Sequence, residues 1–222
     1  MEHKLVLNAE DDPGIYKLLK ELYVLEDIEY RYATTARGAL TLIRQLARER
    51  KEALASGQPE DIQRIKALGR VVIQLDGKFP DAIGVDEEPI TPETEPELYA
   101  DPVVARHLNV QQEPLAEGQS PDEPTRLVAV ATTEIGREFA NAILVGRAAV
   151  QELGADNVGF LLTTATTHVP VSPSDFLSDG ELGQVPFERV NKPFVVGALL
   201  DAVDHVAQGD IRYALPLQDG TI

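Results

Sequence analysis

The chain has 222 residues, a formal net charge of −17 at pH 7 and no cysteine. The length suits one domain with a sizeable core, and the acidic balance argues against direct binding of nucleic acid or anionic lipid, because those partners need clustered Lys and Arg. The lack of cysteine excludes disulfides, iron–sulfur clusters and thiolate zinc sites, and fits a reducing cytoplasm.

The amino terminus leads directly into a strand expected at Leu5 to Ala9, without the charged and then apolar pattern of a signal peptide. No stretch approaches the roughly 20 apolar residues that span a bilayer, so we expect a soluble, cytoplasmic protein. Asp12 and Pro13 predict the cap and first position of a helix that continues to Leu25. A strand over 28–33, a helix from Ala36 to about Arg50 and a strand ending in Asp76 follow.

The carboxyl-terminal half alternates apolar elements with regions rich in turn residues. We expect insertions at about 83–125, which is acidic and proline-rich around a short helix at 102–108, and at 163–185. The other expected elements are strands at 127–132, 157–162 and 187–191 and helices at 136–153 and after Pro193. We interpret residues 1–222 as a single domain, with no internal repeat or coiled coil.

Alternating strands and amphipathic helices predict a parallel sheet covered on both faces. Ligand sites in such sheets lie beyond the carboxyl ends of the strands. The residues expected there are all polar or charged: Glu10, Asp11, Asp76, Thr132 and Lys192. The four histidines are scattered without ligand spacing, so surface or structural roles are expected for them.

Two motifs resemble the receiver domain of two-component response regulators. Leu-Val-Leu-Asn-Ala-Glu-Asp-Asp-Pro is similar to the first strand and acidic pair of that family, and Leu-Asp-Gly-Lys-Phe-Pro-Asp to its phosphoacceptor turn. A strand-end threonine and Lys-Pro-Phe before the last helix follow in the family's order. The resemblance implies a flavodoxin-like three-layer sandwich with a five-stranded parallel sheet of order 2-1-3-4-5.

By this resemblance, Asp76 is the carboxylate that accepts a phosphoryl group. Glu10, Asp11, Asp76 and the main-chain carbonyl of Lys78 would bind Mg²⁺, a hard cation that prefers oxygen ligands. Thr132 and Lys192 would stabilise the charge on the phosphoryl oxygens. The resemblance thus implies a signalling domain rather than a conventional enzyme.

The expected partners are a histidine kinase or histidine phosphotransfer protein and a downstream protein target, with a stand-alone receiver as the expected arrangement. A rival hypothesis is a receiver-like adaptor or scaffold that works without phosphorylation. Arg189, which stands where many receivers have an aromatic residue, and the two insertions favour this rival. The Asp76 motif also looks like that of haloacid-dehalogenase-type phosphatases, but their nucleophile position holds Gln74 here.

Overall fold

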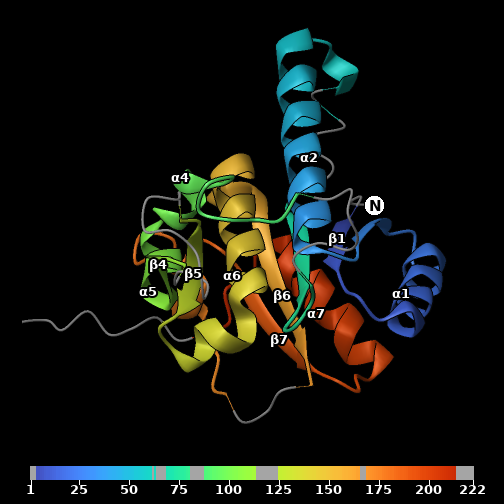
Figure 1. Ribbon diagram of the computed structural model, residues 1–222. Coiled ribbons are helices and arrows are strands. Elements are labelled where there is room, and N and C mark those ends of the chain that lie inside the picture. Colours follow the sequence, from blue (N-terminus) through green and yellow to red (C-terminus); the bar gives the residue numbers. More distant parts are fainter. Residues whose placement is uncertain are drawn as a thin grey trace, which may run out of the picture.

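The computed structural model describes residues 4–61, 63, 69–80, 88–113, 125–165 and 169–213. A five-stranded sheet of order β2-β1-β3-β6-β7 lies at its centre, and all its neighbouring strands are parallel (Figure 1). The strands are β1 (Leu5–Ala9), β2 (Glu29–Ala33), β3 (Val71–Asp76), β6 (Val158–Thr164) and β7 (Phe187–Asn191). Counted along the chain among these five, the order is 2-1-3-4-5. The predicted flavodoxin-like fold class is therefore confirmed.

The three central strands are buried on both faces. Every residue of β1 and β6 is buried, and in β3 only the terminal Asp76 is partly exposed. Their nearly continuous apolar sequences suit this environment, because a strand with helices on both sides has no solvent face. In the register of the sheet, Ala9 lies beside Leu75, and Asp76 lies beside Thr163. The carboxyl ends of β1, β3 and β6 are thus aligned at one edge.

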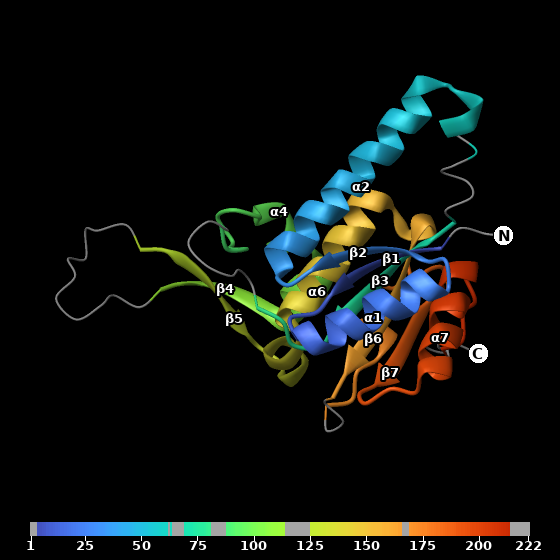
Figure 2. The same ribbon diagram turned by 90° about the vertical axis from the view of Figure 1, so that its right-hand side faces the viewer.

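Two helices pack on each face of the sheet (Figure 2). Leu19 and Val203 from α1 and α7 pack in one core with Val6 of β1, and Ile43 and Ile143 from α2 and α6 pack in the other core. The helices are α1 (Pro13–Leu25), α2 (Ala36–Ser56), α6 (Glu134–Leu153) and α7 (Val196–Gln208). The amphipathic patterns in the sequence thus supply one buried stripe for each face.

Side-chain caps determine where three of these helices begin. The carboxylate of Asp12 accepts hydrogen bonds from the N–H groups of Gly14 (2.7 Å) and Ile15 (3.1 Å), so the predicted capping role is confirmed. Thr35 caps α2 and Thr133 caps α6 in the same way. Such caps satisfy amide groups that have no partner within the helix. The cap at Asp12 thus sets the start of α1 directly after Glu10 and Asp11.

A second, two-stranded sheet lies between β3 and α6 in the sequence. The segment contains α4 (Pro96–Tyr99), α5 (Pro102–His107), β4 (Leu108–Gln112) and β5 (Leu127–Ala131). The predicted short helix is confirmed by α5. The prediction that the strand ending in Thr132 belongs to the parallel sheet is wrong, because β5 pairs antiparallel with β4 in a separate sheet. The two strands are short and largely exposed, and the hairpin extends from the body of the protein in Figure 2.

The second predicted insertion, 163–185, begins too early. Thr163 and Thr164 are the last residues of β6, and a short 3-10 helix at Pro173–Asp175 is part of the connection to β7. Residues 81–87 and 114–124, which overlap the first predicted insertion, and 166–168 in the second lie outside the described residues. Within the part of the chain that the structure describes, no helix combines the length and apolar character needed to cross a membrane.

Candidate functional site

Three carboxylates converge at the carboxyl edge of the parallel sheet. Glu10 and Asp11 follow β1, Asp76 ends β3, and one oxygen from each lies within 4.8 Å of the others. Glu10 is fully buried, Asp76 is partly buried and Asp11 is exposed. Because neighbouring parallel strands end at the same edge, residues 66 positions apart in the sequence become direct neighbours. The set offers hard oxygen donors on the open side of the sheet.

Lys192 brings a positive charge to this cluster. Its Nζ donates a hydrogen bond to Glu10 Oε2 at 2.6 Å and lies 3.2 Å from Asp76 Oδ1. The backbone of Lys192 is held by its own N–H, which donates to Thr164 O at 2.9 Å directly after β7. The peptide bond between Lys192 and Pro193 is cis. A nearly buried ammonium therefore bridges the two carboxylates that lie deepest in the site.

Burial changes the electrostatics of both bridged carboxylates. It is the main cause that raises the pKa of Glu10, and the charge of Asp76 adds to the increase although Lys192 opposes it. The pKa of Asp76 is likewise raised by burial and by Asp11, against the opposing effect of Lys192. Each carboxylate thus keeps its proton to a higher pH than an exposed one would. One ammonium does not fully compensate three carboxylates.

These shifts predict that the site destabilises the fold as the pH rises. Raised pKa values mean that the stability contributed by Glu10 and Asp76 is fully present below their ordinary values of 4.5 and 3.8 and is lost as the pH rises through the folded-state values. We expect the Glu10→Gln, Asp76→Asn double variant to gain stability relative to the natural chain with increasing pH, in the absence of divalent metal. Urea unfolding at a series of pH values measures the difference, and parallel curves for the two proteins would contradict the expectation.

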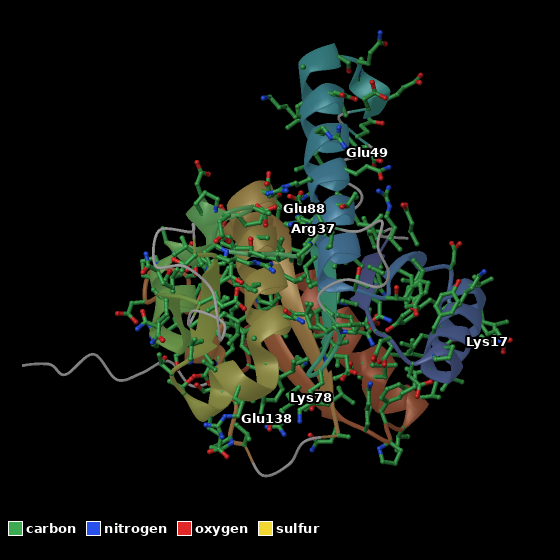
Figure 3. The ribbon with its side chains drawn as sticks, viewed as in Figure 1. Lys17, Arg37, Glu49, Lys78, Glu88 and Glu138 are labelled. Atoms are coloured by element: carbon green, nitrogen blue, oxygen red, sulfur yellow. The ribbon has the colours of Figure 1, made fainter. Side chains whose placement is uncertain are left out.

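The turn after Asp76 is held against β6 and α6. Gly77 donates its N–H to Thr163 O at 3.0 Å, and Asn141 Nδ2 donates to Phe79 O at 2.7 Å. Lys78 and Glu138 form an ion pair and lie close together in Figure 3. A Cβ on Gly77 would lie 2.7 Å from the ring of Phe139, so glycine allows this close approach. Beside the turn is a hollow of about 350 Å³, which Asp11, Lys78 and Arg137 help to line.

The structure does not place Thr132 beside this cluster as a strand-end residue of the parallel sheet. Its N–H donates to His107 O at 2.9 Å and its hydroxyl to Arg106 O at 3.2 Å, so it belongs to the hairpin. The threonine next to Asp76 is Thr163, its partner in the register of the sheet. Thr163 is fully buried, and its hydroxyl donates to Leu75 O at 3.3 Å. The predicted position of Thr132 beside Asp76 is therefore wrong, and the threonines that end the neighbouring strand β6 are Thr163 and Thr164.

A signal for Thr163 is present in the sequence. Two apolar runs end in a pair of threonines, Leu127 to Ala131 before Thr132 and Val158 to Leu162 before Thr163. Only the second run comes between the amphipathic helix α6 and the final strand, as a strand of a β-α-β unit must. The order of elements, rather than the local pattern, separates the two candidates.

Comparison with known proteins gives matches among solved structures alone. No protein-family model and no curated protein matches the chain. The crystal structure of FixJ-N has 10% identity and a TM-score of 0.45, with 96% of this chain and 100% of that chain covered. The signal receiver domain of an HD domain-containing protein from Pseudomonas fluorescens has 12% identity and a TM-score of 0.44, with 94% and 96% covered. The response regulator StyR has 15% identity and a TM-score of 0.38, and the chain spans 60% of its length.

The evidence for the fold is the chain's own sheet order. Five parallel strands in the order 2-1-3-4-5 with two helices on each face define a flavodoxin-like fold. The solved receivers are similar to this chain at low identity. What they bind or act on is a property of those proteins.

Proposed function

We propose that this chain is a receiver domain that accepts a phosphoryl group on Asp76 from a histidine kinase or a histidine phosphotransfer protein. The observation that carries the proposal is the convergence of Glu10, Asp11 and Asp76 around Lys192 at the carboxyl edge of the sheet. In this proposal residues 1–222 are one domain, located in the cytoplasm, and phosphorylation changes its binding to a downstream protein.

The reaction forms one bond and breaks another. An oxygen of the Asp76 carboxylate attacks the phosphorus atom, the bond between phosphorus and the donor imidazole breaks, and the imidazole nitrogen leaves with the electron pair. The product is an acyl phosphate on Asp76. Lys192, already 3.2 Å from Asp76 Oδ1, would move from the carboxylate to the phosphoryl oxygens. Thr163, beside Asp76 in the sheet, can donate its hydroxyl to the same group after leaving Leu75 O.

The residues at this edge fit a divalent cation. Three carboxylates face one ammonium, and burial raises the pKa of two of them, Glu10 and Asp76. All the available donor atoms are oxygens. We infer that Glu10, Asp11, Asp76 and the main-chain carbonyl of Lys78 hold Mg²⁺. When bound, the ion would neutralise the charge that otherwise repels an incoming phosphoryl group.

Intact-mass analysis tests this function. The protein is incubated with acetyl phosphate, with and without Mg²⁺, and the product is then treated with hydroxylamine, which cleaves acyl phosphates. We expect a phosphoryl adduct that requires Mg²⁺ and disappears with hydroxylamine. An Asp11→Asn variant should need more Mg²⁺ for the same yield, because it loses one carboxylate of the site. An adduct that forms equally well in EDTA would contradict the metal assignment.

One observation favours an adaptor that works without phosphorylation. The ammonium of Lys192 already bridges Glu10 and Asp76 at 2.6 and 3.2 Å, so the site is partly compensated by the protein itself. Calorimetric titration with Mg²⁺ separates the two functions. Neither Mg²⁺ binding nor an adduct would favour the adaptor.

A further inference from the structure

A groove of about 450 Å³ lies between the hairpin and α6, outside the carboxylate cluster. One wall is β5, including Leu127, Ala129 and Ala131, and the other includes Ala140 and Leu144 of α6. Its volume is within the range of small binding clefts, about 300 to 1,000 Å³. Its walls combine apolar and polar surface in similar amounts, and Ala129 is exposed at the surface. The groove can therefore hold apolar side chains beside an accessible strand.

The outer edge of β5 carries backbone groups that point away from β4. His107 accepts from Thr132 N–H at 2.9 Å and Arg126 accepts from Glu113 N–H at 2.7 Å, so these pairs are bonded within the hairpin. Bonded and non-bonded pairs alternate in an antiparallel ladder. The intervening residues of β5 must therefore direct their N–H and C=O groups outward. These residues are Leu127, Ala129 and Ala131.

A contact within the chain shows that an outward N–H group of this edge can bind a carboxylate. The outward N–H of Leu127 donates to the carboxylate of Glu93. Among the residues that the structure describes, Ala129 and Ala131 have no partner outside the hairpin for these groups. A strand laid along the edge could take both positions, since main-chain hydrogen bonds to an open edge are a common mode of peptide recognition.

The charges at the groove favour a segment with negative charge. Arg126 and Arg137 line the groove, and one carboxylate lies beside it: that of Glu93, which is bonded to Leu127 N–H and is close enough to Arg126 to interact with its charge. The two arginines thus leave the groove with an excess of positive charge, although the chain as a whole has a formal charge of −17. A basic region on a strongly acidic protein attracts an acidic ligand locally and excludes basic ones. The strands β4 and β5 contain no charged residue, so they do not oppose this preference.

We propose that this groove binds an extended acidic segment of a partner protein, which adds as a strand to the outer edge of β5. Its backbone pairs with Ala129 and Ala131, its apolar side chains enter the groove, and its carboxylates pair with Arg126 and Arg137. An added third strand would also stabilise the hairpin, because two strands alone are marginally stable. This binding role goes beyond phosphoryl transfer and does not depend on it.

Fluorescence anisotropy with a labelled seven-residue peptide of alternating Glu and Val tests the proposal. We expect binding to the natural chain and a loss of about tenfold in affinity for Arg126→Glu, which corresponds to about 1.4 kcal/mol. Arg126 is preferred to Arg137 because Arg137 also borders the hollow beside Asp76. The matched control is Arg48→Glu, the same charge change at an exposed arginine on α2. Equal losses in both variants would show a general charge effect and overturn the proposal.

A second variant tests the strand edge itself. Ala129→Pro removes an outward N–H without removing a hydrogen bond of the hairpin, which is where proline is tolerated in edge strands. We expect it to reduce peptide binding at least as much as Arg126→Glu, while Val130 N–H keeps its protection from hydrogen exchange. Unchanged binding with the hairpin intact, or no binding to the natural chain, would overturn the proposal. Self-association that Ala129→Pro removes would assign the edge to a second copy instead.

Discussion

Substitution of Asp76 by asparagine is expected to abolish the phosphoryl adduct that we propose acetyl phosphate forms with the natural chain. The amide lacks the anionic oxygen that attacks phosphorus, and no other carboxylate of the cluster ends β3 beside Thr163. Glu10 is fully buried and bonded to Lys192, which makes it a poor substitute nucleophile. Intact-mass analysis should show the adduct in the natural protein and none in Asp76→Asn.

The same substitution separates loss of chemistry from loss of fold. Burial raises the pKa of Asp76, so its ionised form is unfavourable in the folded state and the neutral amide should leave the fold at least as stable at neutral pH. Asp179→Asn, at an exposed position in the connection between β6 and β7, is the matched control and should keep the adduct. An adduct of normal yield on folded Asp76→Asn would refute the assignment of the acceptor.

Substitution of Arg147 by alanine is expected to destabilise the protein by about 3–5 kcal/mol, the usual effect of breaking a buried ion pair. Arg147 lies on α6, and its guanidinium donates to Asp101 Oδ2 at 3.0 and 3.1 Å and to Glu181 at 2.5 and 3.0 Å. Burial alone would raise the pKa of Glu181, but hydrogen bonds from Arg147 and Ser178 hold it below its usual value. Without the arginine, the buried Asp101 and the partly buried Glu181 lose the positive charge that compensates them. Urea unfolding monitored by circular dichroism measures the loss.

A surface arginine on the neighbouring helix provides the comparison. Arg44 on α2 pairs with Glu95, but its side chain is 42% exposed and Arg37 still contacts Glu95 at 2.7 Å when Arg44 is removed. Arg37 also holds the backbone of Glu88, which lies next to it in Figure 3. We expect Arg44→Ala to cost less than about 1 kcal/mol. Equal destabilisation by the two substitutions would contradict the role given to burial around Arg147.

The sequence by itself determined the elements of the parallel sheet and most of the charged site. Continuous apolar runs at β1 and β3, the cap at Asp12 and the amphipathic helices are local patterns whose outcome depends on near neighbours. The charged residues of the site could be predicted as a group because each ends a strand or lies within two residues of its end: Glu10, Asp11, Asp76 and Lys192. The carboxyl ends of parallel strands lie at one edge of the sheet, so residues at these ends meet there independently of the loops and insertions between the strands.

Tertiary structure alone decided which of two similar segments enters the sheet. Val158 to Thr164 and Leu127 to Ala131 have nearly the same local pattern, yet the first is fully buried and the second is exposed in a hairpin. The choice depends on α6, which lies between the two segments in the sequence and returns the chain to the edge of β3. The strand after α6, which is β6, therefore lies beside Asp76, and β5, which precedes α6, does not. The pairing of β4 with β5 and the contact of Arg147 with Asp101 likewise join residues distant in sequence. Long-range packing, which a local pattern does not encode, thus determined the position of Thr163 and the groove beside β5.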